Sequence, residues 1–412
     1  MKRIIPIVII VSITIVSALR TCRSGDDDVS DAGKAQPQIP IDKGLQLRID
    51  SFMAAKPSVG SLGLEVYDLT AQQVVYAHRA DMAMRPASCL KLLTCIAALR
   101  YAGAGYKYLT RLYTEGTVAN DTLYGDLVLK TQFDPFFNRD SLYALTEALK
   151  GHNIKAIKGQ VRLDMAFKEP MDHEQHWIMG DLKTGRLGLI YRGYEGLRTE
   201  MLYALQATAG IRVSKDSIQF GRLRPRKATM IVQTATPLQL PIEKALRNSS
   251  NINAEALTYL LGYTISSNGD FRANGKNALI RSVREELKKD PSKVCKIEDG
   301  CGLCPDNRMT PELLIALLNY TYKHPYIYRS VTAGLPLSGK DGTLYDRLTK
   351  PVVAGKIKAK TGTLTREGGI STLAGYFTGK DGHLMAFAIM NNECPVMDGR
   401  WWQDRFCENM LR

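Results

Sequence analysis

Apolar and polar residues alternate near both ends of the chain, which predicts β-strands there. Residues 62–80 alternate on both sides of a short polar turn, a pattern typical of a β-hairpin. Three further strands are predicted near the C-terminus, at residues 352–362, 372–379 and 383–391, the last two joined by a Lys-Asp-Gly turn. Because helices are predicted between these two sets of strands, we expect one sheet assembled from both ends of the chain.

Apolar residues recur at helical spacing between these strands. The first predicted helix runs from Ser88 to about Tyr101, and its apolar stripe is formed by Leu90, Leu93, Ile96, Ala97 and Leu99. After residue 240, helices are predicted at residues 252–265, 275–289 and 310–323. These helices belong to the same unit as the two sets of terminal strands.

The pattern changes in the middle of the chain. Short strands are predicted at residues 122–130, 157–164 and 228–234, with one amphipathic helix near residues 141–152. We therefore expect a strand-rich domain at residues 104–235, inserted into a discontinuous domain formed by residues 41–103 and 236–412. At 412 residues, the chain is long enough for two domains.

The N-terminal residues predict export. Residues 1–22 combine a short basic start with an apolar run, which is typical of a secretory signal. Cys22 stands in a context similar to a bacterial lipoprotein cleavage site, so lipidation at Cys22 and an uncleaved membrane-spanning anchor are both open alternatives. Residues 23–40 are polar and read as a flexible tether. We expect folded structure from about Ile41, in the periplasm or outer cell envelope.

Charge narrows the classes of partner. The formal net charge is +14, which suits an anionic partner such as a cell-wall polymer or lipid headgroups. The chain has no block of consecutive Lys and Arg and no repeated interleaving of basic and aromatic residues. We therefore do not expect a nucleic-acid partner.

Metal sites are weakly indicated. The chain has eight cysteines, and Cys301 and Cys304 have the spacing of metal ligands, with Cys295 nearby. No second C-x-x-C or nearby histidine completes four ligands, so buried thiols or one local disulfide are expected in place of zinc. His173 and His176 fall one residue short of the H-E-x-x-H spacing and lack a third ligand. We expect no metal and no cofactor.

The segment that begins the first predicted helix carries candidate chemistry. Ser88 and Lys91 form an S-x-x-K motif, and residues three apart on a helix lie on the same face. A lysine within hydrogen-bond reach of a serine can act as its base, and the free N–H groups of a helix N-terminus favour developing negative charge. Serine is also a common helix cap, so the motif alone also fits a structural role for Ser88.

Two later motifs strengthen the catalytic reading. Ser249 and Asn251 form an S-x-N motif where a loop enters a helix, and a strand ends with Lys360, Thr361 and Gly362. The glycine permits close approach to the backbone, and the lysine presents positive charge. Two other stretches contain similar motifs. The S-x-N motif within residues 265–270 precedes a turn that closes a helix, and the K-T-G motif within residues 181–186 lies in the predicted inserted domain. We therefore do not assign either of them to the site.

The order S-x-x-K, S-x-N, K-T-G resembles that of the penicillin-recognising serine enzymes, which are the penicillin-binding proteins and serine β-lactamases. Several stretches resemble one branch, the class C low-molecular-mass D-Ala-D-Ala carboxypeptidases and endopeptidases: RPASCLKLLT, PLQLPIEKALRNSSNINAEAL, EDGCGLCPDNRMTPELL, LPLSGKDGTL and KAKTGTL. The resemblance covers about residues 45–170 and 225–392. The chain departs from it at residues 299–304, where the family has Asp-Gly-Ser-Gly-Leu-Ser, and before Asp134.

The resemblance implies a fold of the α+β or α/β class: a β-lactamase/transpeptidase-like penicillin-binding domain whose antiparallel sheet is flanked by helices, with the inserted strand-rich domain. It also implies that Ser88 attacks the carbonyl between two terminal D-alanines of peptidoglycan stem peptides. Lys91 would be the general base, its pKa lowered by Lys360 and partial burial. β-Lactams would be covalent inhibitors at the same serine.

The remaining motif residues receive substrate-binding roles by the same resemblance. Ser249 would relay a proton to the leaving D-alanine, and Asn251 would orient the substrate and Lys91. Lys360 and Thr361 would hold the terminal carboxylate beside Gly362. The backbone N–H groups of Ser88 and Thr363 would form the oxyanion hole.

Two alternative functions remain open. A serine β-lactamase would hydrolyse its acyl-enzyme quickly, but the E-x-x-L-N stretch that one class uses is absent from the sequence. A non-catalytic penicillin-sensing or wall-binding protein would be acylated without turnover. A Ser-His-Asp hydrolase is disfavoured because the chain has no G-x-S-x-G motif.

Overall fold

The computed structural model describes residues 39–166, 168–171, 188–266 and 269–412. Ile39–Arg412 forms one compact unit. The predicted signal segment, Cys22 and nearly all of the predicted tether lie outside the described residues. The first described helix, α1 (Lys43–Ala55), begins beside the predicted start near Ile41. In the described part of the chain, no helix combines the length and apolar character needed to cross a membrane.

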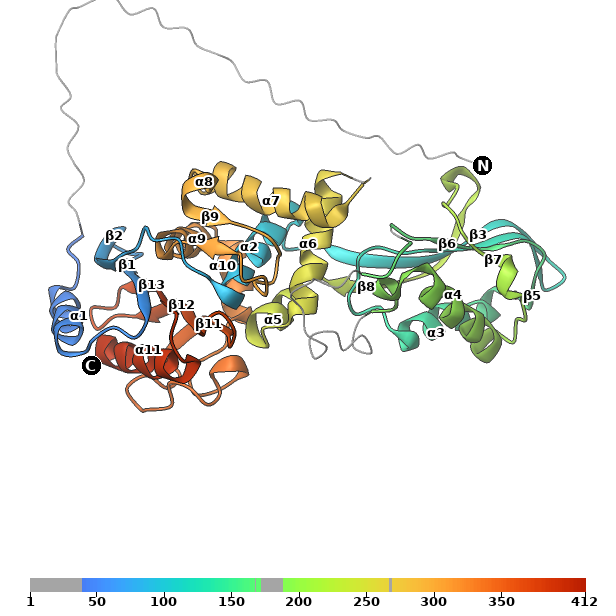
Figure 1. Cartoon of the computed structure of the whole chain (residues 1–412). Helices are drawn as coiled ribbons and strands as arrows, with labels where there is room; N and C mark the ends of the chain where they lie inside the picture. The colour runs from blue at the N-terminus through green and yellow to red at the C-terminus, as the bar shows by residue number, and fades with distance from the viewer. Residues whose placement is uncertain (1–38, 167, 172–187, 267–268) are drawn as a thin grey trace, which may run out of the picture. The chain divides into compact units, whose positions relative to one another are not determined.

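The main sheet is antiparallel and joins the two ends of the chain (Figure 1). Its strands lie in the order β11-β12-β13-β1-β2, so the N-terminal hairpin pairs directly with the last strand. Their bounds are β1 Ser61–Asp68, β2 Gln73–His78, β11 Ile357–Leu364, β12 Ile370–Thr378 and β13 Leu384–Asn392. The prediction of one sheet built from both termini is confirmed.

One face of this sheet is covered by helices that the sequence analysis did not predict. Alternate residues of β1, such as Leu62 and Leu64, pack with Trp402 and Phe406 of α11 (Val396–Leu411). Helix α1 packs beside α11 and contributes Leu45 and Ile49 to the same cluster. The sheet is therefore apolar on both faces, since its remaining alternate residues face a second helical layer.

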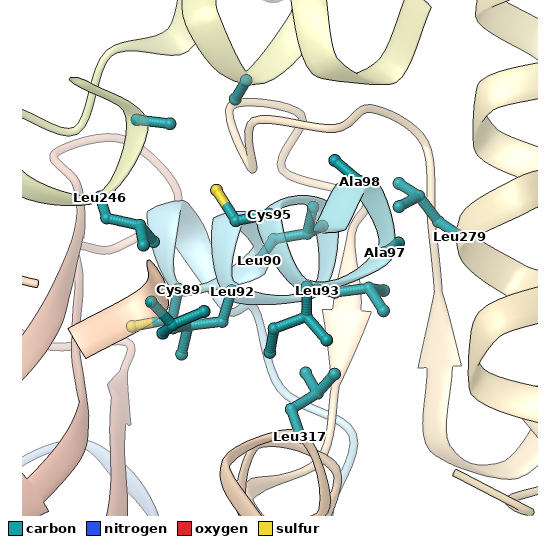
Figure 2. Close-up of a cluster of buried hydrophobic side chains, with 14 of the residues drawn as sticks. Cys89, Leu90, Leu92, Leu93, Cys95, Ala97, Ala98, Leu246, Leu279 and Leu317 are labelled. Atoms are coloured by element: carbon teal, nitrogen blue, oxygen red, sulfur yellow. The ribbon is translucent and has the colours of Figure 1, made fainter. Parts of the chain in front are cut away.

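The second layer is arranged around α2 (Lys91–Ala102). Figure 2 shows Leu246, Leu279 and Leu317 of neighbouring helices lying against α2. These neighbours and the rest of the layer are α5 Gln239–Arg247, α6 Asn251–Ile265, α7 Phe271–Glu285, α8 Pro291–Val294, α9 Pro311–Lys323 and α10 Pro325–Gly334. Every residue of α2 from Lys91 to Leu99 is buried, whereas the apolar stripe predicted from the sequence includes only one face of the helix.

A second sheet lies in the middle of the sequence. Its strand order is β7-β6-β4-β3-β8, with β5 beside β4. Strands β3, β4 and β8 pair antiparallel, whereas β6 pairs parallel with β4 and β7. The strands are β3 Lys107–Ala119, β4 Thr122–Lys130, β5 Ala156–Ile157, β6 Val161–Asp164, β7 Ile218–Phe220 and β8 Thr229–Pro237.

This second sheet has its own apolar cluster. Leu112, Leu127 and Leu163 of its strands pack with residues of α3 (Arg139–Glu147) and α4 (Gly193–Ala204). Helix α3 corresponds to the predicted amphipathic helix, and α4 was not predicted. Since the sheet and the main layers belong to one compact unit, the boundaries 104–235 of an inserted domain stay a prediction.

Helix α6 takes part in both clusters. Leu257, Leu260 and Leu261 pack into the layer around α2, whereas Ala256 packs into the cluster of the second sheet. Both sets of contacts fix the beginning of α6. The S-x-N motif therefore stands at a rigidly supported helix start.

Candidate active site

Ser88 lies in a tight turn before α2 and does not cap that helix. It is the second residue of a 3₁₀ helix (Ala87–Leu90), and α2 begins only at Lys91. Neither helix has a side-chain cap, so the interpretation of Ser88 as a cap is wrong, and the first turn of the predicted helix is 3₁₀ and continues directly into α2. The turn is strained, because Ala87 has a φ of +45°, a value that L-residues rarely adopt. The half-buried Ser88 hydroxyl is thereby left available to Lys91.

Lys91 connects three segments of the site. Its Nζ donates hydrogen bonds of 2.8 Å to Ser88 Oγ and 2.8 Å to Asn251 Oδ1. A third bond of 2.6 Å reaches the backbone carbonyl of Cys301. All three donor positions of an ammonium group are thus used, and the side chain has no exposed surface. This geometry places an amine in contact with the serine hydroxyl that it would deprotonate.

Burial is the main cause that lowers the pKa of Lys91. Nearby Cys301, Asp299 and Glu255 act in the opposite direction, since negative charge favours the ammonium form. The expectation that partial burial and Lys360 lower this pKa needs correction: the burial is complete, and it outweighs the other influences. An amine that loses its proton more readily is a better general base near neutral pH.

A tight turn after residue 298 presents the Cys301 carbonyl to Lys91. The buried carboxylate of Asp299 accepts backbone hydrogen bonds from Cys301 at 3.2 Å and Gly302 at 2.5 Å. It also accepts one from Cys304 at 2.6 Å. Gly302 has a φ of +81°, and a Cβ there would lie 2.0 Å from the Ala87 carbonyl oxygen. This turn therefore supports both the serine and the lysine.

The sequence analysis did not assign Cys301 to the site, because Cys301 contacts Lys91 through its backbone carbonyl. The stretch EDGCGLCPDNRMTPELL resembles the family in sequence, but it does not indicate that a backbone carbonyl within it binds the lysine. All seven cysteines of the described residues have free thiols, so the predicted alternative of a local disulfide is wrong there. In the same part of the chain, the possible metal ligands near Cys301 are Glu255 and Asp299, not Cys304 or Cys295.

The S-x-N motif lies at the start of α6. Ser249 has a φ of +56°, and the next residue, Ser250, caps the helix by accepting a hydrogen bond from the Asn253 backbone. This backbone course places Asn251 in the first helical position, in contact with Lys91. Ser249 Oγ instead accepts a 2.9 Å hydrogen bond from Lys360 Nζ. The two motif side chains thus contact the two different lysines.

Lys360 lies on β11 and is fully buried. Its Nζ also donates a 2.7 Å hydrogen bond to the Thr361 carbonyl. Burial, followed by the positive charge of Lys91, lowers the pKa of Lys360 to about 7. The positive charge of Lys91 therefore disfavours protonation of Lys360.

The rest of the K-T-G segment is held by neighbouring chain. Thr361 Oγ1 donates a 2.7 Å hydrogen bond to Thr343, which belongs to the LPLSGKDGTL stretch. Thr363 Oγ1 accepts a 3.0 Å hydrogen bond from Arg400 of α11. Thr343 and Arg400 are additional residues of the site. Thr343 lies in a stretch that resembles the family, so the sequence could have indicated it, whereas no motif includes Arg400.

Gly362 allows β11 to approach the 3₁₀ turn that carries Ser88. A Cβ at this position would lie 2.0 Å from Thr372 Oγ1 and 2.7 Å from the Pro86 carbonyl oxygen. The predicted reason for the glycine was the approach of a ligand. The close contact in the structure is instead with the Thr372 side chain and the Pro86 backbone of the protein itself.

Gly362→Ala is expected to separate β11 from this turn. Overpacking of this kind typically costs about 1–3 kcal/mol, so we expect a lower melting temperature and slower acylation of the serine. Thermal unfolding and the rate of labelling by a fluorescent penicillin measure both effects. Gly105→Ala is the control, because nothing lies within 4 Å of its new Cβ. Equal effects of the two substitutions would contradict the packing argument.

The structure brings Ser88, Lys91, Asn251, Ser249 and Lys360 together through the hydrogen bonds described above. The second K-T-G motif, within residues 181–186, lies outside the described residues, as do His173 and His176, and the second S-x-N motif lies partly outside them. The arrangement contains a hydroxyl in contact with a buried amine, and a second buried amine beside a second hydroxyl. It can support serine acylation with proton transfer by lysine.

Comparison with known proteins agrees with this chemistry. The D-Ala-D-Ala carboxypeptidase 3 (S13) family matches residues 45–188 and 196–406, which is most of the chain. The chain belongs to this family. It is by class a serine-type D-Ala-D-Ala carboxypeptidase, as the motif order implied.

Individual relatives are distant but span most of the chain. The D-alanyl-D-alanine carboxypeptidase DacB of Haemophilus influenzae is 20% identical over 84% of this chain and 88% of its own length. A carboxypeptidase of Mycobacterium tuberculosis is 26% identical over 83% of this chain and 78% of its own. The family match therefore includes both the main layers and the second sheet.

Solved structures confirm the predicted mixed α+β fold. The crystal structure of penicillin-binding protein 4 (dacB) from H. influenzae superimposes with a TM-score of 0.73, at 19% identity over 88% of this chain and 98% of that chain. The same protein is also known in complex with a β-lactam. A predatory peptidoglycan endopeptidase from Bdellovibrio bacteriovorus gives a TM-score of 0.56, at 19% identity over 81% of this chain and 86% of that chain.

Proposed function

We propose that this carboxypeptidase removes the terminal D-alanine from peptidoglycan stem peptides through an acyl-enzyme on Ser88. The observation that carries the proposal is the buried Lys91 amine, which lies 2.8 Å from both Ser88 Oγ and Asn251 Oδ1. An uncharged amine in this place has a lone pair directed at the serine proton. The lowered pKa of Lys91 makes the uncharged form accessible.

In the first step, Lys91 accepts the Ser88 proton as Oγ attacks the carbonyl carbon between the two D-alanines. The negative charge on the former carbonyl oxygen is stabilised by the backbone N–H groups of Ser88 and Thr363. The carbon–nitrogen bond then breaks, and the proton that Lys91 accepted is relayed through Ser249 to the leaving amine, which returns Lys91 to its uncharged form. Asn251 keeps Lys91 and the substrate amide aligned.

Lys360 and Thr361 bind the carboxylate of the terminal D-alanine. Lys360 already donates to Ser249 Oγ at 2.9 Å, so a carboxylate bound there brings the leaving group next to the proposed proton relay. A charge-assisted hydrogen bond to the carboxylate favours the ammonium form of Lys360. Water then attacks the acyl-enzyme with Lys91 again as base, and releases the shortened peptide.

This assignment makes the pH profile a test of Lys360. Since the pKa of Lys360 is about 7 in the free enzyme, raising the pH above 7 removes the charge that binds the carboxylate. We expect kcat/KM to fall up to tenfold per pH unit on this alkaline limb. Measuring kcat/KM from pH 5 to 9 with a D-Ala-D-Ala peptide tests this limb.

Lys360→Arg provides the comparison for that profile. Arginine stays charged throughout this pH range, so the variant should be slower but should lose the alkaline limb. An alkaline limb that is unchanged in Lys360→Arg would contradict the proposed role of Lys360.

We extend the proposal to β-lactams and to cross-linked peptides. Complexes of the H. influenzae relative with a β-lactam support acylation of Ser88 by these compounds. The similarity to a peptidoglycan endopeptidase supports cleavage of cross-bridges as a second activity of the same site. Substrate and site then lie outside the cytoplasm, with membrane attachment through lipid on Cys22 or an uncleaved anchor.

Mass spectrometry of purified wall fragments incubated with the wild-type protein tests this function. Loss of one D-alanine from pentapeptide stems supports the carboxypeptidase, and conversion of cross-linked dimers to monomers supports the endopeptidase. A matched peptide ending in D-Ala-L-Ala should not be cleaved. Hydrolysis of penicillin with intact wall fragments would support a β-lactamase instead, and stable labelling with no turnover would support a penicillin sensor.

A further inference from the structure

A cavity of about 750 Å³ lies away from the serine site, at the β1–β2 side of the main sheet. It is lined by these two strands, by α9, and by residues that follow α7. The serine site is at β11, and β12 and β13 separate β11 from β1. At about 4.8 Å per strand, the two sites are roughly 14 Å apart across the sheet. The volume is typical of pockets that bind small molecules.

An acidic residue stands on the inner wall of this cavity. Side chains alternate along β1, so Leu64 and Val66 pack towards α11, whereas Glu65 points to the side covered by α9. Only 4% of the Glu65 surface is exposed. Among the described residues, its Oε2 atom has no hydrogen-bond partner. Leaving a buried carboxyl oxygen without a donor costs about 1–3 kcal/mol, so a donor supplied by a ligand would be favoured.

Three of the charged groups near Glu65 already have partners in the protein. Glu312 forms an ion pair with Lys289, and Glu286 accepts hydrogen bonds from Arg100 and Tyr320. The ionisable side chains that line the cavity besides Glu65 are Tyr67, Arg79, Asp81, Glu286, Lys289, Glu312, Tyr320 and Lys323. Since both Lys289 and Glu286 are paired, Glu65 is the buried wall group best placed to receive a new donor.

The electrostatic surroundings favour a cationic donor. Burial, followed by the charge of Glu312, raises the pKa of Glu65 to about 7, while Lys289 acts in the opposite direction. A bound cation would stabilise the carboxylate form of Glu65 and relieve its repulsion from Glu312. An anion would meet both carboxyl groups, and the amine of Lys289 is already engaged by Glu312.

Apolar residues also line the cavity. Ala77 is the cross-strand partner of Glu65, and Val74, Leu287, Ile315 and Ala316 line the same cavity. A ligand that fits both Glu65 and these residues therefore has a charged nitrogen at one end and a short aliphatic part. Asn319, which hydrogen-bonds with Gln72 and lines the same cavity, offers a further polar contact.

We propose that this cavity is a second binding site, which takes a small organic amine with its ammonium group at Glu65 and its aliphatic part against Ile315 and Ala316. The site does not depend on the chemistry at Ser88. Its failure would leave the proposed function unchanged.

Calorimetric titration of the full-length protein with n-pentylamine tests the site. We expect saturable binding at pH 7.5, at least tenfold tighter than binding of n-pentanol, which has the same chain without the charge. Glu65→Gln should weaken pentylamine binding at least tenfold, because the amide removes the negative charge. Glu147→Gln is the control, since that carboxyl is exposed on α3. Equal affinity of the amine and the alcohol, or of the wild type and Glu65→Gln, would overturn the proposal.

Ala316→Phe tests the aliphatic wall without touching Glu65. The larger side chain should occupy the space beside Ile315 that the aliphatic part of the amine would take and so abolish pentylamine binding, with a melting temperature close to that of the wild type. Retained binding in this variant would place the amine elsewhere. This second variant decides the question if Glu65→Gln does not fold.

The pH dependence of stability provides an independent readout. Because the pKa of Glu65 is raised in the folded state, the neutral carboxyl stabilises the fold at acidic pH, and this contribution is lost as the pH rises from about 4.5 through 7. Glu65→Gln should therefore show a smaller fall in melting temperature between pH 5 and 8. Pentylamine should restore part of the wild-type loss at pH 8, and no restoration would count against an ammonium at Glu65.

Discussion

Ser88→Ala is expected to abolish covalent labelling by penicillin and to reduce D-alanine release to background. The substitution removes the only atom proposed to form the acyl bond. Loss of the nucleophile in a serine protease costs a factor of about 10⁶ in kcat. Intact-mass spectrometry after incubation with penicillin measures the adduct, and release of D-alanine from a pentapeptide measures turnover.

Ser250→Ala is a matched control for this experiment. Ser250 is also a serine at a helix start near the site, but its side chain caps α6 and contacts no lysine in the hydrogen bonds described. Loss of the cap should cost about 1 kcal/mol of stability and leave stoichiometric labelling intact. A full adduct on Ser88→Ala would show that another residue is the nucleophile.

The side chains of the site could be predicted from the sequence because their motifs have fixed spacing. The turn that precedes α2 could not, since Ser88 satisfies the residue preferences of a helix cap. Its actual conformation depends on Gly302 and Gly362, which lie far away in the chain and approach within van der Waals distance of the turn. Local preference therefore gave the right residues and the wrong conformation of the first turn.

Contributions of the backbone were also beyond sequence reasoning. Cys301 acts through its carbonyl, which every residue possesses, and only the Asp299 turn directs that carbonyl at Lys91. The complete burial of Lys91 also could not be predicted from the sequence. A lysine on a helix is usually exposed, but here neighbouring helices, the main sheet and the turn at Cys301 surround α2. The pKa argument therefore needed the structure to identify burial as its main cause.

The fold was predicted best where periodicity was clear. The N-terminal hairpin alternates clearly and pairs with the last strand as expected, whereas α11 mixes charged residues such as Asp404 and Arg405 with its apolar ones. In the second sheet, periodicity identified strands but not their direction. The parallel pairing of β4 with β6 follows from the intervening α3, which brings the chain back to the same end.

Lys91→Met is expected to slow acylation by a factor of about 10²–10⁴, the usual contribution of a general base. Methionine fills much of the same volume without an amine, so the Ser88 hydroxyl remains but loses its proton acceptor. The pseudo-first-order rate of labelling by a chromogenic β-lactam measures the effect. Lys380→Met, a substitution of an exposed lysine in the β12–β13 turn, should label at the wild-type rate.

The same variant separates a catalytic from a purely structural role of Lys91. Removing the amine leaves Asn251 Oδ1 and the Cys301 carbonyl without this donor, which costs about 1–3 kcal/mol for each group. Replacing a buried charged amine by an apolar side chain removes a desolvation cost that acts in the opposite direction. We therefore expect a modest shift in melting temperature beside a large loss of rate. If the rate loss disappeared under conditions where variant and wild type are equally folded, Lys91 would be a structural residue and the proposed base would have to be sought elsewhere.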